Sequence, residues 1–438
     1  MQWSRFNKFF QSSDGTYLLY NSASNTFAQL CGEASEIIKR VINDPNADYS
    51  SYPDLFLKLR FGGFLVDDRR DDDLVRILKM RRLTSSYAGK KLLLTIAPTR
   101  ECNFDCEYCY EKNKAPSVMS DNTCEKLVDF IKKQKKAEEL DVTWYGGEPL
   151  LALGTIVKVS KKITALRKKF QAQIITNGYL LTKDAVASLK SLCVTRVQVT
   201  IDGSEKTHDK RRPLLTGGGT YAKIIENITH LMSSDWEGHL DIRVNIDGKN
   251  SEEFAETYNI IKAKYPHSFG KRINVYPGFV DSHEGVDTTG LFNSCDKGAF
   301  VVEMSKKFGI NALPVFPKLT VSGCTMTKRQ AYVVGPEGEL YKCWRDLGKP
   351  GEVIGGIDCE ASWDLSRIAE GMVGASYLND ADCEKCLLFP VCDGGCPKLR
   401  MLNNRDRGNR ATCSYFKSRI REFLELHYRQ NNYSLQTL

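Results

Sequence analysis

The stretch RECNFDCEYCY, residues 100–110, carries three cysteines in the spacing C-x3-C-x2-C. They are Cys102, Cys106 and Cys109. A 4Fe-4S cluster normally takes four thiolates, so a compact set of three leaves one iron open to a ligand that is not protein. The alternatives are structural zinc, which usually adds a distant second cysteine pair, and three unrelated buried thiols. The spacing favours an iron–sulfur cluster.

Strand-like and helix-like segments alternate along the chain from the strand that leads into this stretch onward. The strand candidate 91–97 runs directly into the cysteines, and further strands are predicted at 142–145, 173–176, 196–201, 241–246 and 272–276. Amphipathic helices are predicted between them at 121–136, 154–170, 182–191, 220–232 and 252–264. Repeated βα units build a parallel sheet with right-handed crossovers, so the fold class is α/β with an open, partial barrel. Functional residues of such barrels gather at the carboxyl ends of the strands.

The second predicted strand ends in the sequence YGGEP, residues 145–149. Gly146 and Gly147 allow a close approach of the backbone to a ligand, and Glu148 can accept a hydrogen bond from an ammonium group. A lone sequence of this kind could be only a turn. Together with the three cysteines it resembles the motifs of radical S-adenosylmethionine (SAM) enzymes. The resemblance implies a partial (β/α)6 TIM-like barrel in which SAM binds the open iron and is cleaved to a 5′-deoxyadenosyl radical that removes hydrogen from a substrate.

The same resemblance implies which residues contact SAM. The expected positions are Tyr108, Gly146, Gly147, Glu148, Asn177, Thr200, Asp202 and Arg243. An Asn-Gly turn and a satisfied strand-end aspartate are the alternatives for Asn177 and Asp202. His208 is a candidate acid or base, although a histidine in such a loop is more often a hydrogen-bonding brace. No catalytic acid or base is assigned.

The last third of the chain is rich in cysteine. Cys324, Gly338 and Cys343 follow the spacing C-x13-G-x4-C, and residues 331–341 between the two cysteines predict a β-hairpin in which Gly338 has a positive φ. The further cysteines are Cys383, Cys386, Cys392, Cys396 and Cys413. This series resembles the SPASM domain, which holds two auxiliary 4Fe-4S clusters and is typical of enzymes that modify peptides and proteins.

The resemblance also implies two ligand sets. The first auxiliary cluster takes Cys324, Cys343 and Cys396. The second takes Cys383, Cys386, Cys392 and Cys413. The first set lacks a fourth thiolate, and we expect Cys295 to supply it because a cluster normally takes four. An open iron that binds a substrate thiolate is the alternative. The whole chain would then hold three 4Fe-4S clusters.

The first 88 residues predict a separate small domain. A hairpin over 16–30 precedes helices at 32–41 and 53–62, a short strand at 64–66 and a helix at 73–82. This order resembles the winged-helix-like RiPP recognition element, which captures leader peptides of ribosomally made, modified peptides; a packing appendage to the barrel is the alternative. The predicted domains are a leader-binding domain at 1–88, the barrel at 89–280, a bridging region at 281–323 and the SPASM domain at 324–438.

Composition narrows the class of protein. With 438 residues the chain can hold two or three domains, and its 26% charged and 42% hydrophobic residues are ordinary for a globular protein. No apolar run is long enough to span a membrane and the start does not resemble a signal peptide, so we expect a cytoplasmic protein. The net charge of +8 is spread over helix faces and does not indicate nucleic-acid binding. Fifteen cysteines in that compartment indicate metal.

The combined motifs predict a peptide maturase. A ribosomal precursor peptide would dock through its leader, and hydrogen abstraction would install a thioether or carbon–carbon cross-link, with flavodoxin or ferredoxin as electron donor. One alternative is an anaerobic sulfatase-maturing enzyme, which forms formylglycine. Those enzymes resemble the chain only from the barrel onward and have an acidic residue where Trp344 follows Cys343. The other alternative, a non-catalytic iron–sulfur peptide-binding protein, is disfavoured by the intact cysteine and GGEP motifs.

Overall fold

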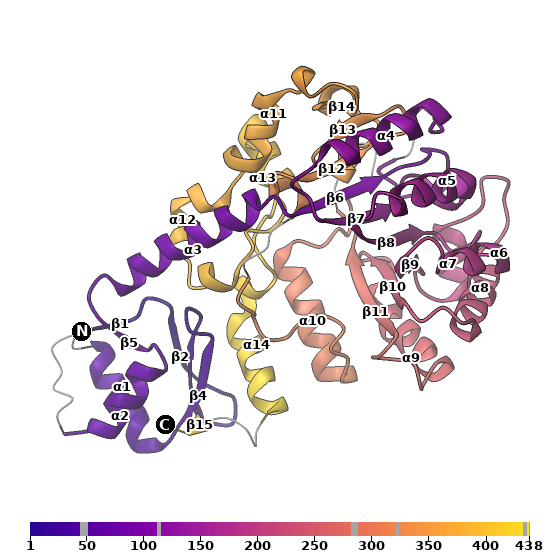
Figure 1. Cartoon of the computed structure of the whole chain (residues 1–438). Helices are drawn as coiled ribbons and strands as arrows, with labels where there is room; N and C mark the ends of the chain where they lie inside the picture. Colours follow the sequence, from indigo (N-terminus) through magenta and orange to yellow (C-terminus); the bar gives the residue numbers. More distant parts are fainter. Residues whose placement is uncertain (44–50, 112–114, 282–287, 321–323, 432–435, 438) are drawn as a thin grey trace. The chain divides into compact units, whose positions relative to one another are not determined.

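A computed structural model describes residues 1–43, 51–111, 115–281, 288–320, 324–431 and 436–437 (Figure 1). Contacts within the chain divide it into two units, and each is described by itself. Unit 1 comprises residues 1–86, 293–324 and 374–438, and unit 2 comprises residues 87–292 and 325–373. No described helix is long and apolar enough to cross a membrane. The predicted domain 324–438 contributes to both units, so the domain boundaries remain predictions.

Unit 2 is built on one nine-stranded sheet. Its order is β11-β10-β9-β8-β7-β6-β12-β13-β14, and all neighbours from β11 to β12 are parallel. The strands are β6 (Lys91–Ile96), β7 (Glu139–Trp144), β8 (Lys169–Thr176), β9 (Val194–Thr200), β10 (His239–Ile246), β11 (Ile273–Phe279), β12 (Ala331–Val334), β13 (Glu339–Tyr341) and β14 (Gly355–Gly356). The six predicted barrel strands are confirmed as β6 to β11. Their alternating buried residues, such as Leu92, Leu94 and Ile96 of β6, form the core beneath the helices.

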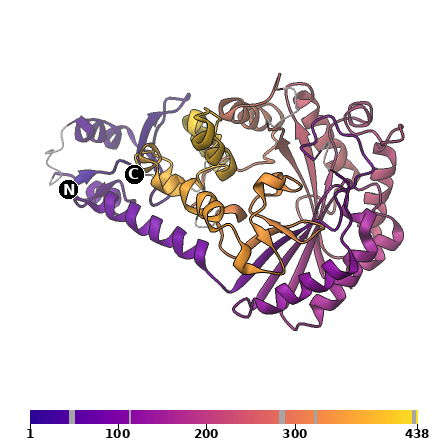
Figure 2. The same cartoon turned by 90° about the horizontal axis from the view of Figure 1, so that it is seen from above.

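Helices connect the parallel strands and lie in an arc along the outside of the sheet (Figure 2). They are α4 (Asp121–Lys133), α5 (Leu153–Thr164), α6 (Lys183–Ser188), α7 (Glu205–Arg211), α8 (Tyr221–Ser233) and α9 (Phe254–Lys264); α11 (Leu365–Ala369) follows later in the chain. The prediction of a helix over 154–170 extends past the observed end of α5. The helix ends at Thr164, Arg167 takes a left-handed φ of 56°, and Lys169 already begins β8. The basic run 167–169 has no apolar periodicity to continue the helix.

The predicted hairpin over 331–341 is confirmed, because β12 and β13 pair antiparallel and Gly338 has a φ of 87°. The sequence did not predict that β12 also pairs parallel with β6, with Ala331 opposite Leu93 and Val334 opposite Ile96. A segment that follows the barrel thus continues the barrel's own sheet.

Unit 1 contains a small α/β module formed by the start of the chain. Its strands are β1 (Gln2–Trp3), β2 (Asn7–Gln11), β3 (Tyr17–Asn21), β4 (Thr26–Leu30) and β5 (Leu65–Val66), and its helices are α1 (Gly32–Asn43), α2 (Pro53–Phe61) and α3 (Arg70–Tyr87). The predicted hairpin is β3–β4, and β2 adds an unpredicted third antiparallel strand. β5 pairs with β1.

The remaining elements of unit 1 come from later segments. They are α10 (Ser294–Phe308), α12 (Ala381–Glu384), α13 (Pro397–Asp406), α14 (Phe416–Gln430) and β15 (Gln436–Thr437). Two apolar layers enclose the β2–β3–β4 sheet. Leu19, Ala28 and Leu30 face α1 and α2 on one side, and Leu18, Tyr20 and Phe27 face Leu424 and Tyr428 of α14 on the other. The strand β15 completes the sheet beside β4.

Candidate active site

The carboxyl ends of the parallel strands of unit 2 surround a cavity of about 920 Å³. The three cysteines of the loop after β6 line it, together with residues that leave the ends of β7 to β11. The predicted site residues on its wall are Cys102, Cys106, Tyr108, Cys109, Gly146, Gly147, Asn177, Thr200 and Arg243. The structure therefore brings most of the predicted SAM and cluster residues to one place, as the barrel topology requires.

Of the three thiols, Cys106 is buried, and Cys102 and Cys109 are half-buried. Burial raises the pKa of Cys102 to about 12 and that of Cys109 to about 11, and it also raises the pKa of Cys106. The thiols of Cys106 and Cys109 further disfavour ionisation of Cys102, because the three groups interact electrostatically. Ligands of iron are thiolates, so binding of metal by this loop must release protons.

Gly146 and Gly147 pack against the cysteine loop. Gly146 has a φ of 121°, and a Cβ atom there would lie 2.2 Å from the carbonyl oxygen of Thr99. A Cβ atom at Gly147 would lie 2.2 Å from the carbonyl oxygen of Glu101. We expected the glycines to allow approach to a ligand. The structure gives them a second role, because they allow the end of β7 to approach the backbone of the cysteine loop.

The carboxylate of Glu148 is fully buried and bonded within the protein. Its Oε1 accepts hydrogen bonds from Thr176 Oγ1 at 2.7 Å and from the Leu150 amide at 3.0 Å, and its Oε2 accepts from the Asn177 amide at 2.7 Å. Burial raises its pKa. In this structure Glu148 joins the ends of β7 and β8, and its predicted contact with the SAM amino group stays a prediction.

Asn177 reaches the cavity from the end of β8, and Arg243 reaches it from β10. The side-chain Nδ2 of Asn177 donates to Asn103 Oδ1 at 2.7 Å, and this bond connects the end of β8 to the cysteine loop. Arg243 lies over Gly278 of β11, where a Cβ atom would be 2.3 Å from Arg243 Nε. Gly278 therefore makes room for the guanidinium, a requirement that becomes visible only when β10 and β11 are paired.

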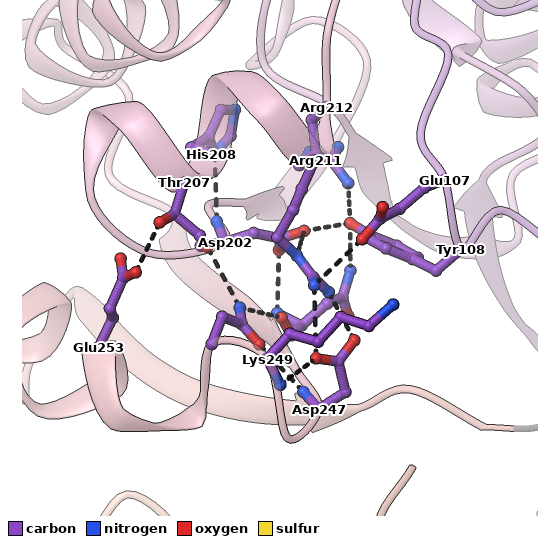
Figure 3. A network of polar contacts seen from close by, with 12 residues as sticks. Glu107, Tyr108, Asp202, Thr207, His208, Arg211, Arg212, Asp247, Lys249 and Glu253 are labelled. Atoms are coloured by element: carbon purple, nitrogen blue, oxygen red, sulfur yellow. Dashed lines mark hydrogen bonds and ion pairs between the residues drawn. The ribbon is translucent and has the colours of Figure 1, made fainter. Parts of the chain in front are cut away.

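Tyr108 is the centre of a polar network beneath the cavity (Figure 3). Its hydroxyl donates to Asp202 Oδ2 and accepts from Arg212 Nη1 at 2.6 Å and Asn245 Nδ2 at 3.0 Å. Asp202 is fully buried, and its Oδ1 accepts from the Asn245 amide at 3.0 Å. Burial raises the pKa of Tyr108 well above its usual range. Tyr108 lines the cavity, whereas Asp202 supports it from behind.

Two buried arginines of this network were not predicted as site residues. Arg211 forms a two-point ion pair with Asp247 (3.0 and 3.4 Å) and reaches Glu107 at 3.3 Å (Figure 3). Arg212 lines the cavity and its positive charge favours the thiolate of Cys106. Functional residues of such barrels gather at the carboxyl ends of strands, and this expectation applies to Asp247, because it directly follows β10.

His208 is a brace. Its Nδ1 accepts a hydrogen bond from the Asp202 amide at 3.1 Å, so the ring proton is placed on Nε2, which donates to Thr220 Oγ1 at 3.1 Å. Thr220 Oγ1 in turn donates to the Arg212 carbonyl at 2.8 Å. Burial lowers the pKa of His208 well below its usual range. The fully buried, neutral ring has no exposed face for acid or base catalysis.

The segment after Cys343 also reaches the cavity. Trp344 and Arg345 line it, and the Trp344 ring packs edge-on against Tyr145 with ring centroids 5.4 Å apart. Cys343 itself is buried. An aromatic side chain therefore stands at the cavity position that follows this cysteine.

Four cysteines of unit 1 gather around the start of α14. Cys383, Cys386 and Cys392 interact electrostatically, and Lys417 interacts with Cys413, Cys386 and Cys383. These are the four predicted ligands of the second auxiliary cluster. Lys417 Nζ lies 3.5 Å from Cys413 Sγ, and Arg400 Nη2 lies 3.3 Å from Cys383 Sγ.

A buried arginine supports the loop that carries Cys392. Arg82 of α3 donates from Nη2 to the carbonyl oxygens of Phe389 (2.9 Å), Pro390 (3.2 Å) and Cys392 (2.8 Å). Its guanidinium also stacks over Tyr377. The helix that ends the N-terminal module thus fixes the backbone of a predicted ligand loop.

The predicted ligands of the first auxiliary cluster come from both units. Cys295, Cys324 and Cys396 belong to unit 1, and Cys343 belongs to unit 2. Cys295 lies at the start of α10 and interacts with Arg419. This ligand set, including Cys295 as the fourth thiolate, stays a prediction.

The donor chemistry fits the cofactors that the motifs imply. Across the described ranges, no three or more His, Cys, Asp or Glu side chains converge on a position for a single metal ion. Each thiolate of a 4Fe-4S cluster binds a different iron, so cluster ligands surround a group of metals. Three thiols on the wall of a cavity that also carries amide, hydroxyl and guanidinium groups match a cluster with an open iron and a SAM molecule.

Comparisons with known proteins identify the family of this chain. The radical SAM superfamily matches residues 96–261. A serine-type anaerobic sulfatase-maturating enzyme from Bacteroides thetaiotaomicron is 30% identical over 373 residues, covering 75% of this chain and 87% of that enzyme. The radical SAM cyclopropyl synthase TigE from Paramaledivibacter caminithermalis is 22% identical, covering 96% of this chain and 95% of TigE.

A solved structure extends the likeness to the fold. The structure of Streptococcus suis SuiB bound to precursor peptide SuiA has a TM-score of 0.54 with this chain at 14% identity, covering 94% of this chain and 98% of SuiB. This chain belongs to the radical SAM superfamily, and within it to the SPASM-type enzymes. A 4Fe-4S cluster and SAM are therefore its cofactors.

Proposed function

We propose that this enzyme is a maturase of ribosomally made precursor peptides and that it installs a thioether or carbon–carbon cross-link. The observation that carries the proposal is the N-terminal module, in which the antiparallel strands β2, β3 and β4 and the helices α1 and α2 precede the barrel. TigE aligns over 96% of this chain, which must include most of residues 1–88, whereas the sulfatase-maturating relative aligns over 75%. SuiB, whose fold this chain shares over 94% of its length, was solved with a precursor peptide.

When bound, the cluster and SAM supply the radical that removes a hydrogen atom from the substrate. The chain's own residues prepare the place for this reaction. Cys102, Cys106 and Cys109 would hold the cluster, and Asn177 and Arg243 would orient SAM from the strand ends. The Tyr108 network fixes the cysteine loop to β9 and β10. The protein's contribution is therefore positioning of the reactants.

Two auxiliary clusters, one held by Cys383, Cys386, Cys392 and Cys413, would accept the electron that remains after cross-link formation. The cations Arg400 and Lys417 beside two of these sulfurs support this role, since hydrogen bonds to cluster sulfurs influence reduction potentials. An electron donor such as flavodoxin or ferredoxin would reduce the SAM cluster.

Sulfatase maturation is the second candidate, because the sulfatase-maturating relative is 30% identical to this chain. Trp344, the residue after Cys343, argues against sulfatase maturation. Trp344 stands on the cavity wall where we expect an acidic residue in sulfatase-maturing enzymes. An aromatic ring at this position favours a substrate other than a sulfatase.

The test is anaerobic reconstitution of the enzyme with SAM, a reductant and a short peptide encoded beside its gene, followed by mass spectrometry and assay of 5′-deoxyadenosine. Loss of two hydrogens from the peptide supports a cross-link. An unchanged mass with uptake of solvent deuterium would indicate epimerisation instead. A parallel reaction with a sulfatase peptide that gains formylglycine would favour the second candidate. Failure to form deoxyadenosine with any peptide would contradict the activity altogether.

A further inference from the structure

One face of α3, the last helix of the N-terminal module, packs against residues 377–392, which carry three predicted ligands of the second auxiliary cluster. Both segments belong to unit 1. Val75 and Leu78 share one apolar cluster with Leu378 and Phe389, and Cys383 packs against it. The buried residues of α3 recur at helical spacing and are Asp71, Val75, Leu78 and Arg82. The N-terminal module and this cysteine segment therefore share a core.

Two polar contacts accompany this core. Lys79 Nζ lies 2.6 Å from Glu384 Oε2, and Ser22 Oγ donates to the carbonyl oxygen of Leu387. The ion pair is partly exposed, and such pairs contribute little to stability. Neither contact reaches the backbone of a cysteine. The contacts that do so are those of Arg82.

Arg82 binds the backbone turn that leads to Cys392. Residues Phe389–Val391 form a single 3-10 turn, and carbonyl groups at the end of such a turn have no partner within it. The Nε of Arg82 donates to the carbonyl oxygen of Thr320 at 3.3 Å. Its Nη2 donates to three carbonyl oxygens, those of Phe389, Pro390 and Cys392. One side chain therefore fixes the backbone at Cys392 and immediately before it.

The guanidinium of Arg82 has little freedom to move. It lies over the rings of Tyr377 and Phe389, 5.1 Å from each centroid, and only 6% of the residue is exposed. The planar guanidinium presents its donors in a fixed fork, which the flexible ammonium of a lysine cannot reproduce. Arg82 is thus a rigid connection between α3 and the turn.

The buried charge of Arg82 has incomplete compensation from the protein. Its Nη1 is buried and has no hydrogen-bond partner among the described residues. Burial lowers the pKa of Arg82, whereas the charges of Tyr377, Cys392 and Asp393 favour its protonated form. A buried cation needs a negative partner, and an iron-bound thiolate at Cys392 would supply one. The charge is therefore better compensated when a cluster is bound.

We propose that Arg82 is a positioning residue of the second auxiliary cluster, which presents the Cys392 thiolate to iron and makes the N-terminal module a structural part of the cluster site. This inference rests on the proposed function, which includes that cluster. It also has a reciprocal consequence. If α3 stabilises the ligand loop for iron binding, then the bound cluster must stabilise α3 by the same free energy.

The first test measures how firmly iron is held. Full-length protein in which alanine replaces Cys102, Cys106 and Cys109 should hold only the two auxiliary clusters, roughly 8 iron atoms. Loss of an outer partner of a metal ligand typically weakens metal binding by about 10–100-fold. With excess EDTA, half of the iron should therefore leave the Arg82→Gln variant at least about tenfold faster than it leaves the background protein. Arg81→Gln, which changes the exposed neighbouring arginine, is the control. Equal rates in the two variants would overturn the proposal.

The second test measures the cluster itself, so that a general loss of stability is not mistaken for positioning. Arg82→Gln should lower the midpoint potential of the second auxiliary cluster and alter its electron paramagnetic resonance spectrum, because removal of a nearby positive charge disfavours the reduced form. Arg82→Lys keeps the charge without the fork, so iron should still leave it faster than the background protein. A wild-type potential and spectrum in Arg82→Gln would overturn the proposal, as would wild-type iron retention in Arg82→Lys.

The third test uses the reciprocal effect. Hydrogen exchange of α3 amides over residues 75–82 should be slower in cluster-loaded protein than in iron-free protein, and Arg82→Gln should abolish most of this difference. Unchanged exchange in β3 and β4 verifies that the N-terminal module of each variant is folded. Identical α3 exchange with and without iron would contradict the coupling.

Iron content and peptide modification together separate this inference from the proposed function. If the triple-alanine background holds no iron, the proposed auxiliary clusters are wrong and the inference is overturned with them. If the background holds roughly 8 iron atoms, the wild-type enzyme modifies its precursor peptide and Arg82→Gln leaves both clusters unaltered, only the role of Arg82 is overturned.

Discussion

The hydroxyl group of Tyr108 donates a hydrogen bond to the buried carboxylate of Asp202. This contact joins the loop that carries the three cysteines to the end of β9. Because Arg212 and Asn245 donate to the same hydroxyl, a single side chain connects the cysteine loop, β9, β10 and the segment after α7. These bonds hold the cysteine loop in place relative to the ends of the strands.

We expect Tyr108→Phe to lower the free energy of unfolding by about 1–3 kcal/mol, since it leaves buried polar partners unsatisfied. The variant should also bind SAM more weakly, because Tyr108 lines the cavity. Anaerobic chemical denaturation and a SAM-binding titration measure the two effects. Tyr87→Phe is the matched control because the Tyr87 side chain is exposed. Equal losses in both variants would contradict a role for the network.

Replacement of Gly147 by alanine should force the cysteine loop and the GGEP segment apart. The added Cβ atom would lie 2.2 Å from a backbone carbonyl oxygen that cannot move aside easily. Overpacking of this kind costs about 1–3 kcal/mol, and the iron content of the purified protein should fall as well. The control is Gly154→Ala in α5, where a Cβ atom meets nothing within 4 Å. That variant should be as stable as the wild type or up to about 1 kcal/mol more stable.

Arg400→Gln should lower the midpoint potential of one auxiliary cluster. The change removes a charged donor 3.3 Å from Cys383 Sγ, and loss of such a bond disfavours the more negative, reduced cluster. A redox titration followed by electron paramagnetic resonance measures the shift, and an unchanged iron content shows that the cluster is still bound. Lys385→Gln removes an exposed positive charge nearby in sequence. If it shifts the potential as much as Arg400→Gln does, the hydrogen bond to sulfur is not the cause.

Iron analysis tests the number of clusters. Three 4Fe-4S clusters correspond to roughly 12 iron atoms per chain, and simultaneous replacement of Cys102, Cys106 and Cys109 by alanine should leave roughly 8. Cys295→Ala should perturb the spectrum of one auxiliary cluster and leave that of the SAM cluster unchanged. A wild-type content of roughly 4 iron atoms would contradict both auxiliary clusters.

His208 should not contribute to the pH dependence of the reaction. Burial keeps the pKa of His208 well below its usual range, and Nδ1 accepts a hydrogen bond from the Asp202 amide, so the ring stays neutral where a free histidine would titrate. His208→Asn should therefore lower stability, through loss of the bonds to Asp202 and Thr220, without changing the shape of the pH profile of deoxyadenosine formation. Disappearance of one limb of that profile would identify His208 as an acid or base after all.

Much of the barrel could be predicted because its strands alternate buried apolar residues with partly exposed ones and are separated by amphipathic helices. Short-range signals also located the cysteine loop, the GGEP turn and the hairpin at Gly338. The sequence could not show the second role of Gly146 and Gly147, because the carbonyl groups that they approach lie on another strand end. The partnership of Arg211 with Asp247 likewise depends on tertiary contacts.

The hydrogen bonds of Glu148 within the protein are a second feature that could not be predicted from the sequence. A carboxylate beside a ligand-binding turn is a reasonable partner for an ammonium group, and nothing local reveals that Thr176 and the Asn177 amide satisfy it. The pairing of β12 with β6 was missed for a related reason, since a hairpin signal does not specify which other strand the hairpin joins.

The parallel pairing of β12 with β6 has a practical consequence for anyone who wishes to isolate the catalytic core. A fragment that stops at Phe292 would retain all six barrel strands but would leave one side of β6 without its neighbour. An uncovered hydrophobic strand beside the cysteine loop is a template for intermolecular β-pairing. Such a fragment should aggregate during expression, and extension to Val373, which restores β12 to β14, should recover a soluble protein.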